Sequence, residues 1–487
     1  MSSLPTILKK ITTLSKKEKT PVYIVGGYVR DFLLQRLQKK DLDFVVLGSG
    51  LEFARKLDET LKQVGSLIEF PDFDTARYLI GEGEDRIELE FAGARTESYS
   101  PDSRKPKVEQ TTLEEDLKRR DFTVNAMALP VDVLEKILSG KSTLEKFHKH
   151  LIDPFDGQKD LQEKILRTPL DPDVTFQEDP LRMFRAVRFA AQLHFSIELK
   201  TLESIYQNRE RIKIVSMERV QEELLKLFSC SQPSIGLVLL FQTQLMDIVL
   251  PEISALDGVE DVYGHSHKNN LTHTFKVVDN IAERSGNVWL RLAGFFHDIG
   301  KPQTKKFIPK IGWTFHAHEF VGRKMMRLIG RRLRLPNDKI DYLSKLIRWH
   351  MQPINLMDKG ITDSAVRRLI VNVGEEIEDL LVLGRSDITT GNPFKKEKRL
   401  KNYDWLESRV AEVIDKDKLR AFQSPVRGEE IMAVCGLKPG PTVGKIKKAI
   451  EEAILNGLVP NEHDPAFDYF TSIKDSYIKN LHDWERA

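Results

Sequence analysis

The chain has 487 residues, which is too many for one hydrophobic core and predicts about three or four domains. Its 75 lysines and arginines nearly balance 73 aspartates and glutamates, so a surface that binds nucleic acid has to be local. The two cysteines lie far apart, which excludes a disulfide framework, and no apolar run reaches the ~20 residues that cross a bilayer. We therefore expect a multidomain cytoplasmic protein without a membrane partner.

The predicted fold class is α+β. Residues 21–138 mix helical stretches with short β-branched runs at 22–25, 44–47 and 87–91. Beyond Asp153, apolar residues recur at helical spacing, as in Leu181, Phe184, Val187 and Ala191. The sequence thus predicts an α/β first domain and a mostly helical remainder. Four basic runs are candidates for an RNA surface, although each alone is more often a solvated face: residues 9–19, 104–107, 323–334 and 395–401.

The first chemical pattern is a strand, residues 22–25, that runs into Gly26 and Gly27 and then a helix. Glycine lets backbone amides approach a ligand closely, and the start of a helix favours negative charge, so this turn suits a phosphate group. By itself the pattern also fits an ordinary tight turn.

Two acids follow at strand spacing. Asp41 and Asp43 flank Leu42 directly before an apolar run, and strand geometry places both carboxylates on one face. A third carboxylate is expected from another strand-like run, with Glu90 as the candidate and Glu88 in reserve. Carboxylates on one face repel unless a cation neutralises them, and Mg²⁺ does so in sites that also bind substrate phosphates. The other explanation is a solvated edge strand.

The Gly-Gly turn, the helix and the acid-apolar-acid string resemble the signature of the DNA polymerase beta nucleotidyltransferase superfamily. The string Gly27-Tyr28-Val29-Arg30-Asp31 is similar to that of the class II CCA-adding and poly(A) polymerase family. The resemblance implies catalysis by Asp41, Asp43 and Glu90, with Mg²⁺ on Asp41 and Asp43. It also implies that Gly26, Gly27 and Arg30 bind the nucleotide.

Further strings resemble this family in the same order. Residues 119–126 are similar to its ribose and phosphate contact motif, which implies nucleotide contacts for Arg120, Asp121 and Asn125; a helix start is the simpler explanation of that string alone. Residues 178–182 match its Glu-Asp-x-x-Arg motif, in which Asp179 and Arg182 would select C or A in place of a template. We expect these two side chains on one helix face, where a simple ion pair is the alternative.

A second chemical pattern lies in the helical remainder. Imidazoles and carboxylates together suit Mn²⁺, Ni²⁺, Co²⁺ or Fe²⁺, although a lone histidine on an apolar helix is more often a core residue. The chain carries, in this order, His273, His297, Asp298, His318, His350 and Asp387. This order resembles the HD phosphohydrolase superfamily. The resemblance implies that all six are ligands of a metal site that two ions could share through Asp298.

The combined expectation is a polymerase-beta-like nucleotidyltransferase α/β head, residues 1–148, followed by an all-helical neck, 149–235, an HD domain, 236–400, and a tail, 401–487. The resemblance implies template-independent addition of C, C and A from CTP and ATP to the 3′ end of tRNA, with phosphoester hydrolysis at RNA ends by the HD domain. Residues 96–111, which correspond to the family's flexible loop, favour complete CCA addition. The glycine-rich, basic residues 436–448 suggest tRNA binding by the tail.

Several alternatives stay open from the sequence. They are a poly(A) polymerase, an enzyme that adds only CC or only A, and, from another class, an HD phosphohydrolase or a signalling uridylyltransferase. The oligomer is expected to be a monomer or a homodimer.

Overall fold

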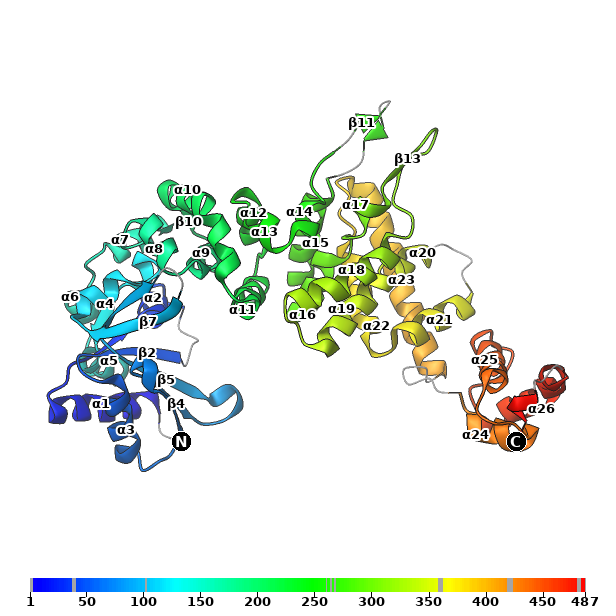
Figure 1. Ribbon diagram of the computed structural model, residues 1–487, viewed down its shortest axis with the longest axis horizontal. Coiled ribbons are helices and arrows are strands. Elements are labelled where there is room, and N and C mark those ends of the chain that lie inside the picture. Colours follow the sequence, from blue (N-terminus) through cyan, green and yellow to red (C-terminus); the bar gives the residue numbers. More distant parts are fainter. Residues whose placement is uncertain are drawn as a thin grey trace. The chain divides into compact units, whose positions relative to one another are not determined.

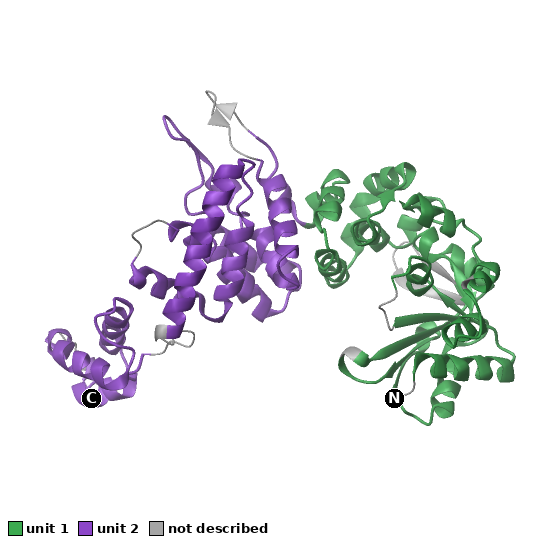
Figure 2. Ribbon diagram, turned by 180° about the vertical axis from the view of Figure 1, so that it is seen from behind, with its two compact units in different colours: residues 1–249 green, residues 250–487 purple. Residues whose placement is uncertain are grey.

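The computed structural model describes residues 3–36, 41–100, 103–259, 261–262, 265–266, 269–357, 362–417, 424–479 and 483–486. The chain divides into two compact units, Met1–Val249 and Leu250–Ala487 (Figure 2). No helix in the described part of the chain is both long and apolar enough to cross a membrane.

The first unit begins with a mixed sheet of six strands in the order β3-β4-β5-β2-β1-β8. Only β2 and β5 pair in parallel among these neighbours. The strands are β1 (Val22–Val25), β2 (Asp41–Val46), β3 (Ser66–Phe70), β4 (Thr75–Ile80), β5 (Ile87–Gly93) and β8 (Ala128–Pro130). A separate hairpin is formed by β6 (Arg95–Ser100) and β7 (Ser103–Gln110).

Helices cover one face of this sheet (Figure 1). They contact one another and the strands because the alternate residues of β2 and β5 are apolar: Phe44 and Phe91 stack with ring centroids 4.7 Å apart, and Phe53 of α3 packs on Phe91. Leu42 and Phe44 are therefore buried, whereas Asp41 and Asp43 face the other way and are exposed. The covering helices are α1 (Leu4–Glu18), α3 (Gly50–Thr60) and α5 (Val131–Leu138).

The opposite face has a smaller core at one end only. Val25 and Val45 are buried there with Leu117 and Ala126. Leu117 belongs to α4 (Leu113–Lys118), and Ala126 directly follows η3 (Thr123–Asn125). Helix α2 (Gly27–Leu33) contacts β1, β2 and η3. This cover stops short of Asp41 and Asp43, which leaves the acidic part of the face open.

Helices complete the first unit. Gly236 of α12 lies against Leu227 and Val187, and a Cβ at this glycine would come within 2.4 Å of Leu227, so the helices pack closely. The elements are α6 (Leu144–His150), α7 (Gly157–Glu163), α8 (Pro172–Glu178), α9 (Leu181–Leu193), α10 (Leu199–Asn208), η4 (Arg209–Ile214), α11 (Met217–Phe228), α12 (Ser234–Gln242) and α13 (Leu245–Val249), with the short pair β9 (Ile165–Leu166) and β10 (Ser196–Ile197).

The end of this unit differs from the expected limit of the neck. Helix α12 packs on α9 and helix α13 on η4, so the compact unit extends to Val249. The limit expected between residues 235 and 236 falls inside α12, and the limit expected between residues 400 and 401 falls inside the long helix α23 (Pro393–Asp417).

The second unit is helical apart from two short hairpins. Its first part consists of α14 (Pro251–Ser254), α15 (Asn270–Ala282), α16 (Val288–Phe296), α17 (Lys301–Thr304), α18 (His318–Arg332), α19 (Asn337–Trp349), α20 (Gln352–Asn355), α21 (Asp363–Val373), α22 (Ile377–Ser386) and α23, with hairpins β11 (Asp261–Val262) to β12 (His265–Ser266) and β13 (Lys306–Ile308) to β14 (Gly312–Thr314). Its last part has a core of its own, formed by α24 (Gly428–Cys435), α25 (Pro441–Leu455) and α26 (His463–Ile478).

Candidate functional site

The acidic residues of the head form two rows across neighbouring strands. Parallel pairing of β2 with β5 places Asp41 beside Glu88 and Asp43 beside Glu90. Residues that are directly opposite in a sheet share a face, so all four carboxylates lie on the face opposite α1, α3 and α5.

The Gly-Gly turn lies directly next to this acidic face. Gly26 has a φ of +71°, a conformation that other residues adopt only with strain, and it precedes α2. A Cβ at Gly26 would lie 3.2 Å from Nη1 of Arg120 and 3.3 Å from Oδ2 of Asp43. The structure therefore brings Gly26, Asp43 and Arg120 together although they come from three separate motifs.

Asp43 is the most perturbed of these carboxylates. The surrounding protein mass and the neighbouring Glu90 and Asp41 raise the pKa of Asp43, and Arg120 opposes this effect. Crowded negative charge of this kind is relieved by a bound cation, and oxygen ligands suit Mg²⁺. The donor set thus fits magnesium.

Arg77 of β4 contacts the third acid, and we did not anticipate it from the sequence. Its Nη2 lies 2.9 Å from Oε2 of Glu90, and its Nε lies 2.8 Å from Oε1 of Glu88. Among the described residues, Asp41, Asp43 and Glu90 do not gather within 4.8 Å as a metal cluster. The signal that identifies Arg77 is the pairing of β4 with β5, which places it opposite Glu90 and which the sequence does not specify.

Three of the expected nucleotide-binding residues take part in a buried network. Arg30, 1 % exposed, donates to Asp31 and, at 2.7 Å, to Oδ1 of Asn125. Asn125 donates in turn to Asp121, which also accepts from Arg185. Burial would raise the pKa of Asp121, but Arg185 and Asn125 outweigh it and lower that pKa to about 2. The network holds the segment that follows Arg120 against α2 and α9.

The expected placement of Asp179 and Arg182 on one helix face is wrong. Asp179 ends α8 in an extended conformation, and α9 begins only at Leu181. The reason is Pro180, because a proline disfavours helical backbone in the residue before it.

Both side chains nevertheless have fixed partners in the neck. Asp179 accepts a hydrogen bond of 2.8 Å from Arg219, and Arg182 donates to the backbone oxygen of Arg119 at 2.8 Å. Arg182 also contacts Glu178, with 3.2 Å between the charged atoms. The bond to Arg119 connects residues 178–182 to the segment that carries Arg120.

The six expected metal ligands of the second unit lie close together. Asp298 belongs to two groups of possible ligands, one with His273 and His297 and the other with His318 and His350. In the first group, Nε2 of His297 is 3.1 Å from Asp298 Oδ2, and Nε2 of His273 is 2.9 Å from Asp387 Oδ1. In the second group, Nε2 of His318 is 3.4 Å from Asp298 Oδ1. Asp298 is thus placed to bridge two ions.

The orientation of the imidazole rings fits this use. Nδ1 of His297, His318 and His350 each lies 2.7 or 2.8 Å from a backbone oxygen three residues earlier, so each Nε2 points inward. Within the described residues the buried Nε2 of His297 makes no hydrogen bond of normal geometry, and its neighbour at 3.1 Å is the carboxylate of Asp298. Ligating histidines are held in this way, with one nitrogen fixed and the other on the ion.

The charge states also suit ligation. Burial would raise the pKa of Asp298, but His297 and Lys301 hold it well below its usual range. Burial and the nearby His297 lower the pKa of His350 to about 3, which keeps this imidazole neutral. A carboxylate and neutral imidazoles are the forms that bind a divalent metal.

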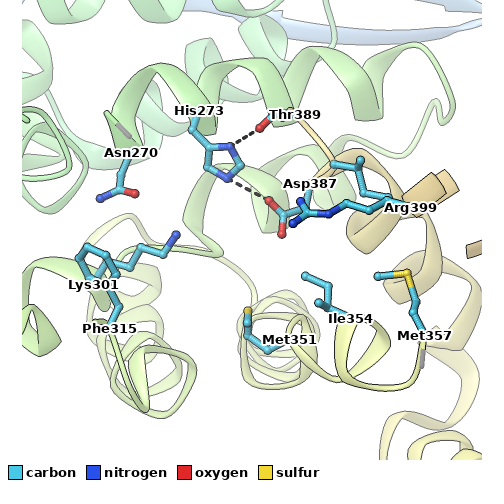
Figure 3. A pocket seen from close by; sticks show the side chains of 11 residues that line it. Asn270, His273, Lys301, Phe315, Met351, Ile354, Met357, Asp387, Thr389 and Arg399 are labelled. Carbon is cyan, nitrogen blue, oxygen red and sulfur yellow. Dashed lines mark hydrogen bonds and ion pairs between the residues drawn. The ribbon is translucent and has the colours of Figure 1, made fainter. Parts of the chain in front are cut away.

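A cavity of about 320 Å³ opens beside this centre (Figure 3). His273 and Asp387 line it together with two cations, Lys301 and Arg399, that we did not anticipate as site residues. Lys301 Nζ is 2.6 Å from Asp298 Oδ2. The apolar part of the wall is formed by Phe315, Met351, Ile354 and Met357.

Three protein families match the chain. The Poly A polymerase head domain matches residues 22–167, the "Probable RNA and SrmB- binding site of polymerase A" matches residues 194–256, and the HD domain matches residues 270–389. The head match contains the acidic face, and the HD match contains the six residues around Asp298.

Named relatives agree with these matches. An A-adding tRNA nucleotidyltransferase of Deinococcus radiodurans is 31 % identical over 71 % of this chain and 76 % of its own. A CC-adding tRNA nucleotidyltransferase of Thermus thermophilus is 30 % identical over 90 % of this chain and 91 % of its own. A Multifunctional CCA protein of Neisseria gonorrhoeae is 33 % identical over 68 % of this chain and 73 % of its own.

The fold has solved counterparts. The CCA-adding enzyme of Bacillus stearothermophilus, determined in complex with CTP, aligns with 98 % of this chain and 100 % of its own at a TM-score of 0.67 and 22 % identity. The Thermus thermophilus relative alone covers 90 % of this chain. The chain therefore belongs to the CCA-adding tRNA nucleotidyltransferase and poly(A) polymerase family of nucleotidyltransferases, and it carries an HD domain.

Proposed function

We propose that this nucleotidyltransferase adds C, C and A to the 3′ end of tRNA, with CTP and ATP as substrates and no nucleic-acid template. The observation that carries the proposal is the acidic face of the head, where Asp43 lies next to both Gly26 and Arg120. Relatives named as CC-adding, A-adding and multifunctional CCA enzymes support tRNA as the acceptor.

In the proposed site, Asp41 and Asp43 hold Mg²⁺, and Glu90 is the third catalytic carboxylate. Magnesium neutralises the triphosphate and favours ionisation of the attacking 3′-hydroxyl. Arg120 and the backbone amides at Gly26 and Gly27 bind the triphosphate, because both present positive charge to it. Arg30, Asp121 and Asn125 position this segment through their buried network, and Asn125 is the group proposed for the sugar hydroxyl.

Base choice is assigned to Asp179 and Arg182. A carboxylate accepts from the exocyclic amine that C and A share, and a guanidinium donates to a ring nitrogen or carbonyl. A wrong base leaves such groups unpaired, which gives strong discrimination. Arg219 and Glu178 hold the two side chains in place, and the bond from Arg182 to Arg119 supports the connection to the triphosphate site.

Complete CCA addition, rather than CC or A alone, is favoured by the segment at residues 96–111. The described part of this segment forms a hairpin of β6 and β7, which follows the sheet strand β5 in sequence. Residues 101–102 lie outside the described residues.

The test uses three tRNA acceptors, ending before C, after C and after CC, each with one labelled triphosphate. We expect C on the first two acceptors and A on the third, with addition then stopping. A long A-tract on unrelated RNA would establish the poly(A) alternative, and addition of only C or only A would establish the partial enzymes. Asp43→Ala should abolish incorporation, whereas Asp132→Ala, which removes a surface ion pair with Lys136 in the same unit, should not.

We further propose that the HD centre binds Mn²⁺, Ni²⁺, Co²⁺ or Fe²⁺ through His273, His297, Asp298, His318, His350 and Asp387. The inward Nε2 atoms and the bridging Asp298 support this proposal. A divalent metal held by these residues would supply Lewis-acid chemistry for phosphoester hydrolysis, and damaged RNA ends are the substrates that fit a tRNA-end enzyme. Two reactions test it: opening of a 2′,3′-cyclic phosphate to a monophosphate at an RNA end, and release of inorganic phosphate from an RNA 3′-phosphate. Both should be lost in Asp298→Asn.

These substrates also suggest the cellular compartment in which the protein acts. tRNA and nucleoside triphosphates are cytoplasmic, so the cytoplasm is the compartment we propose. Addition requires only one chain in this scheme, and a monomer or a homodimer is compatible with it. Tail residues 436–448, which begin α25 with exposed lysines, are proposed to contact tRNA phosphates.

A further inference from the structure

We propose that Arg399 of α23 binds the phosphate of a substrate that enters the cavity beside the HD centre. The inference rests on the proposal that this centre acts on phosphoesters, and it names the residue that selects the phosphate. The family matches assign no role to helix α23, because the HD match ends at residue 389.

The cavity has the size and position of a substrate site. Its volume of about 320 Å³ is at the lower end of the range for small-molecule sites, roughly 300–1,000 Å³, which suits one nucleotide and not several. His273 and Asp387 belong both to its wall and to the residues around the metal centre. A phosphate in this part of the cavity would therefore lie next to the ions.

Polar and apolar side chains occupy different parts of the wall. Figure 3 shows His273, Asp387 and Arg399 along one side of the cavity and Met351, Ile354 and Met357 along the other. Phe315 and the methionine side chains offer the flat, polarisable surface on which a base packs. Arg399 offers a planar set of donors that matches two phosphate oxygens.

Arg399 is available for this role, whereas Lys301 is not. Lys301 already contacts Asp298 at 2.6 Å. Arg399 is exposed at the mouth, and no hydrogen bond or ion pair connects it to the described part of the chain. An arginine that serves the fold would have a carboxylate partner, as Arg385 and Arg409 have in the same region.

Helix α23 is held firmly enough to place this arginine. Tyr403 is fully buried against Gly384 of α22, and Arg385 donates to Glu407 of α23 at 3.0 Å. Arg399 lies about one turn before Tyr403 on the same helix. The anchor therefore fixes the distance between Arg399 and the metal centre.

The test is a fluorescence titration of the full-length, metal-free protein. All five tryptophans lie in the second unit, and Trp349 directly precedes His350 and Met351, so intrinsic fluorescence reports on this unit alone. The probes are adenosine, adenosine 3′-monophosphate and a trinucleotide RNA with a 3′-phosphate. We expect the monophosphate to bind roughly ten times more tightly than adenosine, as a charge-assisted hydrogen bond to phosphate predicts.

Substitutions of Arg399 make the test specific. In Arg399→Ala the advantage of the monophosphate should disappear, and Arg399→Lys should restore part of it, because lysine keeps the charge and loses the planar fork. Lys398→Ala, at the neighbouring exposed position outside the cavity, should bind like the unchanged protein. Equal binding of the monophosphate by Arg399→Ala and Lys398→Ala would overturn the proposal.

The probes distinguish an RNA end from a free nucleotide as the ligand. Measuring hydrolysis as well distinguishes failure of this inference from failure of the proposed hydrolytic function. Equal, Arg399-dependent binding of trinucleotide and monophosphate identifies the end of an RNA as the ligand; binding of the monophosphate alone identifies a free nucleotide. Both outcomes support the nucleotide pocket. Arg399-dependent binding without hydrolysis after metal is added would refute only the hydrolytic function, and hydrolysis with Arg399-independent binding would refute only the inference.

Discussion

Arg77 contacts the two acids of β5 and is the residue through which the head can be tested most directly. We expect Arg77→Ala to slow nucleotide addition about tenfold, because residues that orient metal ligands contribute factors of roughly 10–100. Loss of the guanidinium also leaves more uncompensated negative charge near Asp43, whose pKa is already raised. The acid limb of the pH–rate profile should therefore move to higher pH.

The control for Arg77 is Arg55→Ala. Arg55 makes a similar exposed pair with Glu69, at 2.7 Å, away from the acidic rows. This variant should keep the rate and the pH profile of the unchanged protein. A faster Arg77→Ala enzyme would contradict the positioning role, because it would mean that Arg77 merely withholds Glu90 from the site.

Asp121 allows a stability prediction with a definite sign. Its pKa is about 2 in the folded head, below the ordinary value of 3.8, so the folded state is favoured whenever the carboxylate is ionised. Asp121→Asn should lower the free energy of unfolding by about 2 kcal/mol at neutral pH. The difference between the two proteins should shrink as the pH falls from about 4 to about 2, where the carboxylate protonates in both states.

The measurement uses the distribution of tryptophan. The first unit contains none of the five, so circular dichroism follows both units and fluorescence only the second. Asp121→Asn should shift the dichroism transition and leave the fluorescence transition unchanged. Asp132→Asn removes an exposed ion pair with Lys136 and should change little; an equal effect of both substitutions would remove the case for the buried network.

At the scale of elements, the turn between β1 and α2 depends on a glycine for two separate reasons. Gly26→Ala should cost about 1–2 kcal/mol because of its positive φ. Its new Cβ would also press on Arg120 and Asp43, at 3.2 and 3.3 Å, and we expect a roughly 100-fold loss of addition rate from their displacement.

Gly140 separates these two effects. It has nearly the same φ, +72°, but a Cβ there meets nothing within 4 Å. Gly140→Ala should therefore also lose stability through its positive φ, but it should keep its addition rate. Equal rate losses in the two variants would show that strain, and not contact with the site, is the cause.

The elements also show what a sequence can predict. The alternation of Asp41 and Asp43 with apolar residues indicates their common face, because strand periodicity is local. The conformation of Asp179 could also have been predicted, since Pro180 follows it directly. The contacts of Glu90 with Arg77 and of Asp121 with Arg185 could not, because they depend on strand register and on the packing of a helix from a distant part of the chain.

The second unit likewise contains residues that the sequence identifies and one that it does not. Its six ligand candidates are identified by residue type and order, and the structure gathers them around Asp298. Arg399 has no such signal, because an exposed arginine in a basic helix resembles any solvated residue. Only the return of α23 to the metal centre, fixed by Tyr403 and Gly384, distinguishes it.

At the scale of the whole molecule, the two compact units predict two chemistries that can be removed separately. Metal ions give the clearest test, since binding to the folded state stabilises only the unit that binds. After chelation, Mn²⁺ or Ni²⁺ at 100 times its dissociation constant should stabilise the second unit by about 2.7 kcal/mol. The midpoint of unfolding followed by tryptophan fluorescence should therefore rise. The midpoint of the dichroism change that comes from the first unit should stay the same.

Two variants identify the site behind this metal effect. Asp298→Asn should abolish the shift, whatever its own stability, because Asp298 belongs to both groups of ligands. His316→Ala removes an exposed histidine outside those groups and should retain the full shift. If neither metal moves the fluorescence transition of the unchanged protein, the HD centre is not a transition-metal site; if both variants respond equally, the ion binds elsewhere. Unchanged tRNA addition by Asp298→Asn would then show that the head acts without the HD metal.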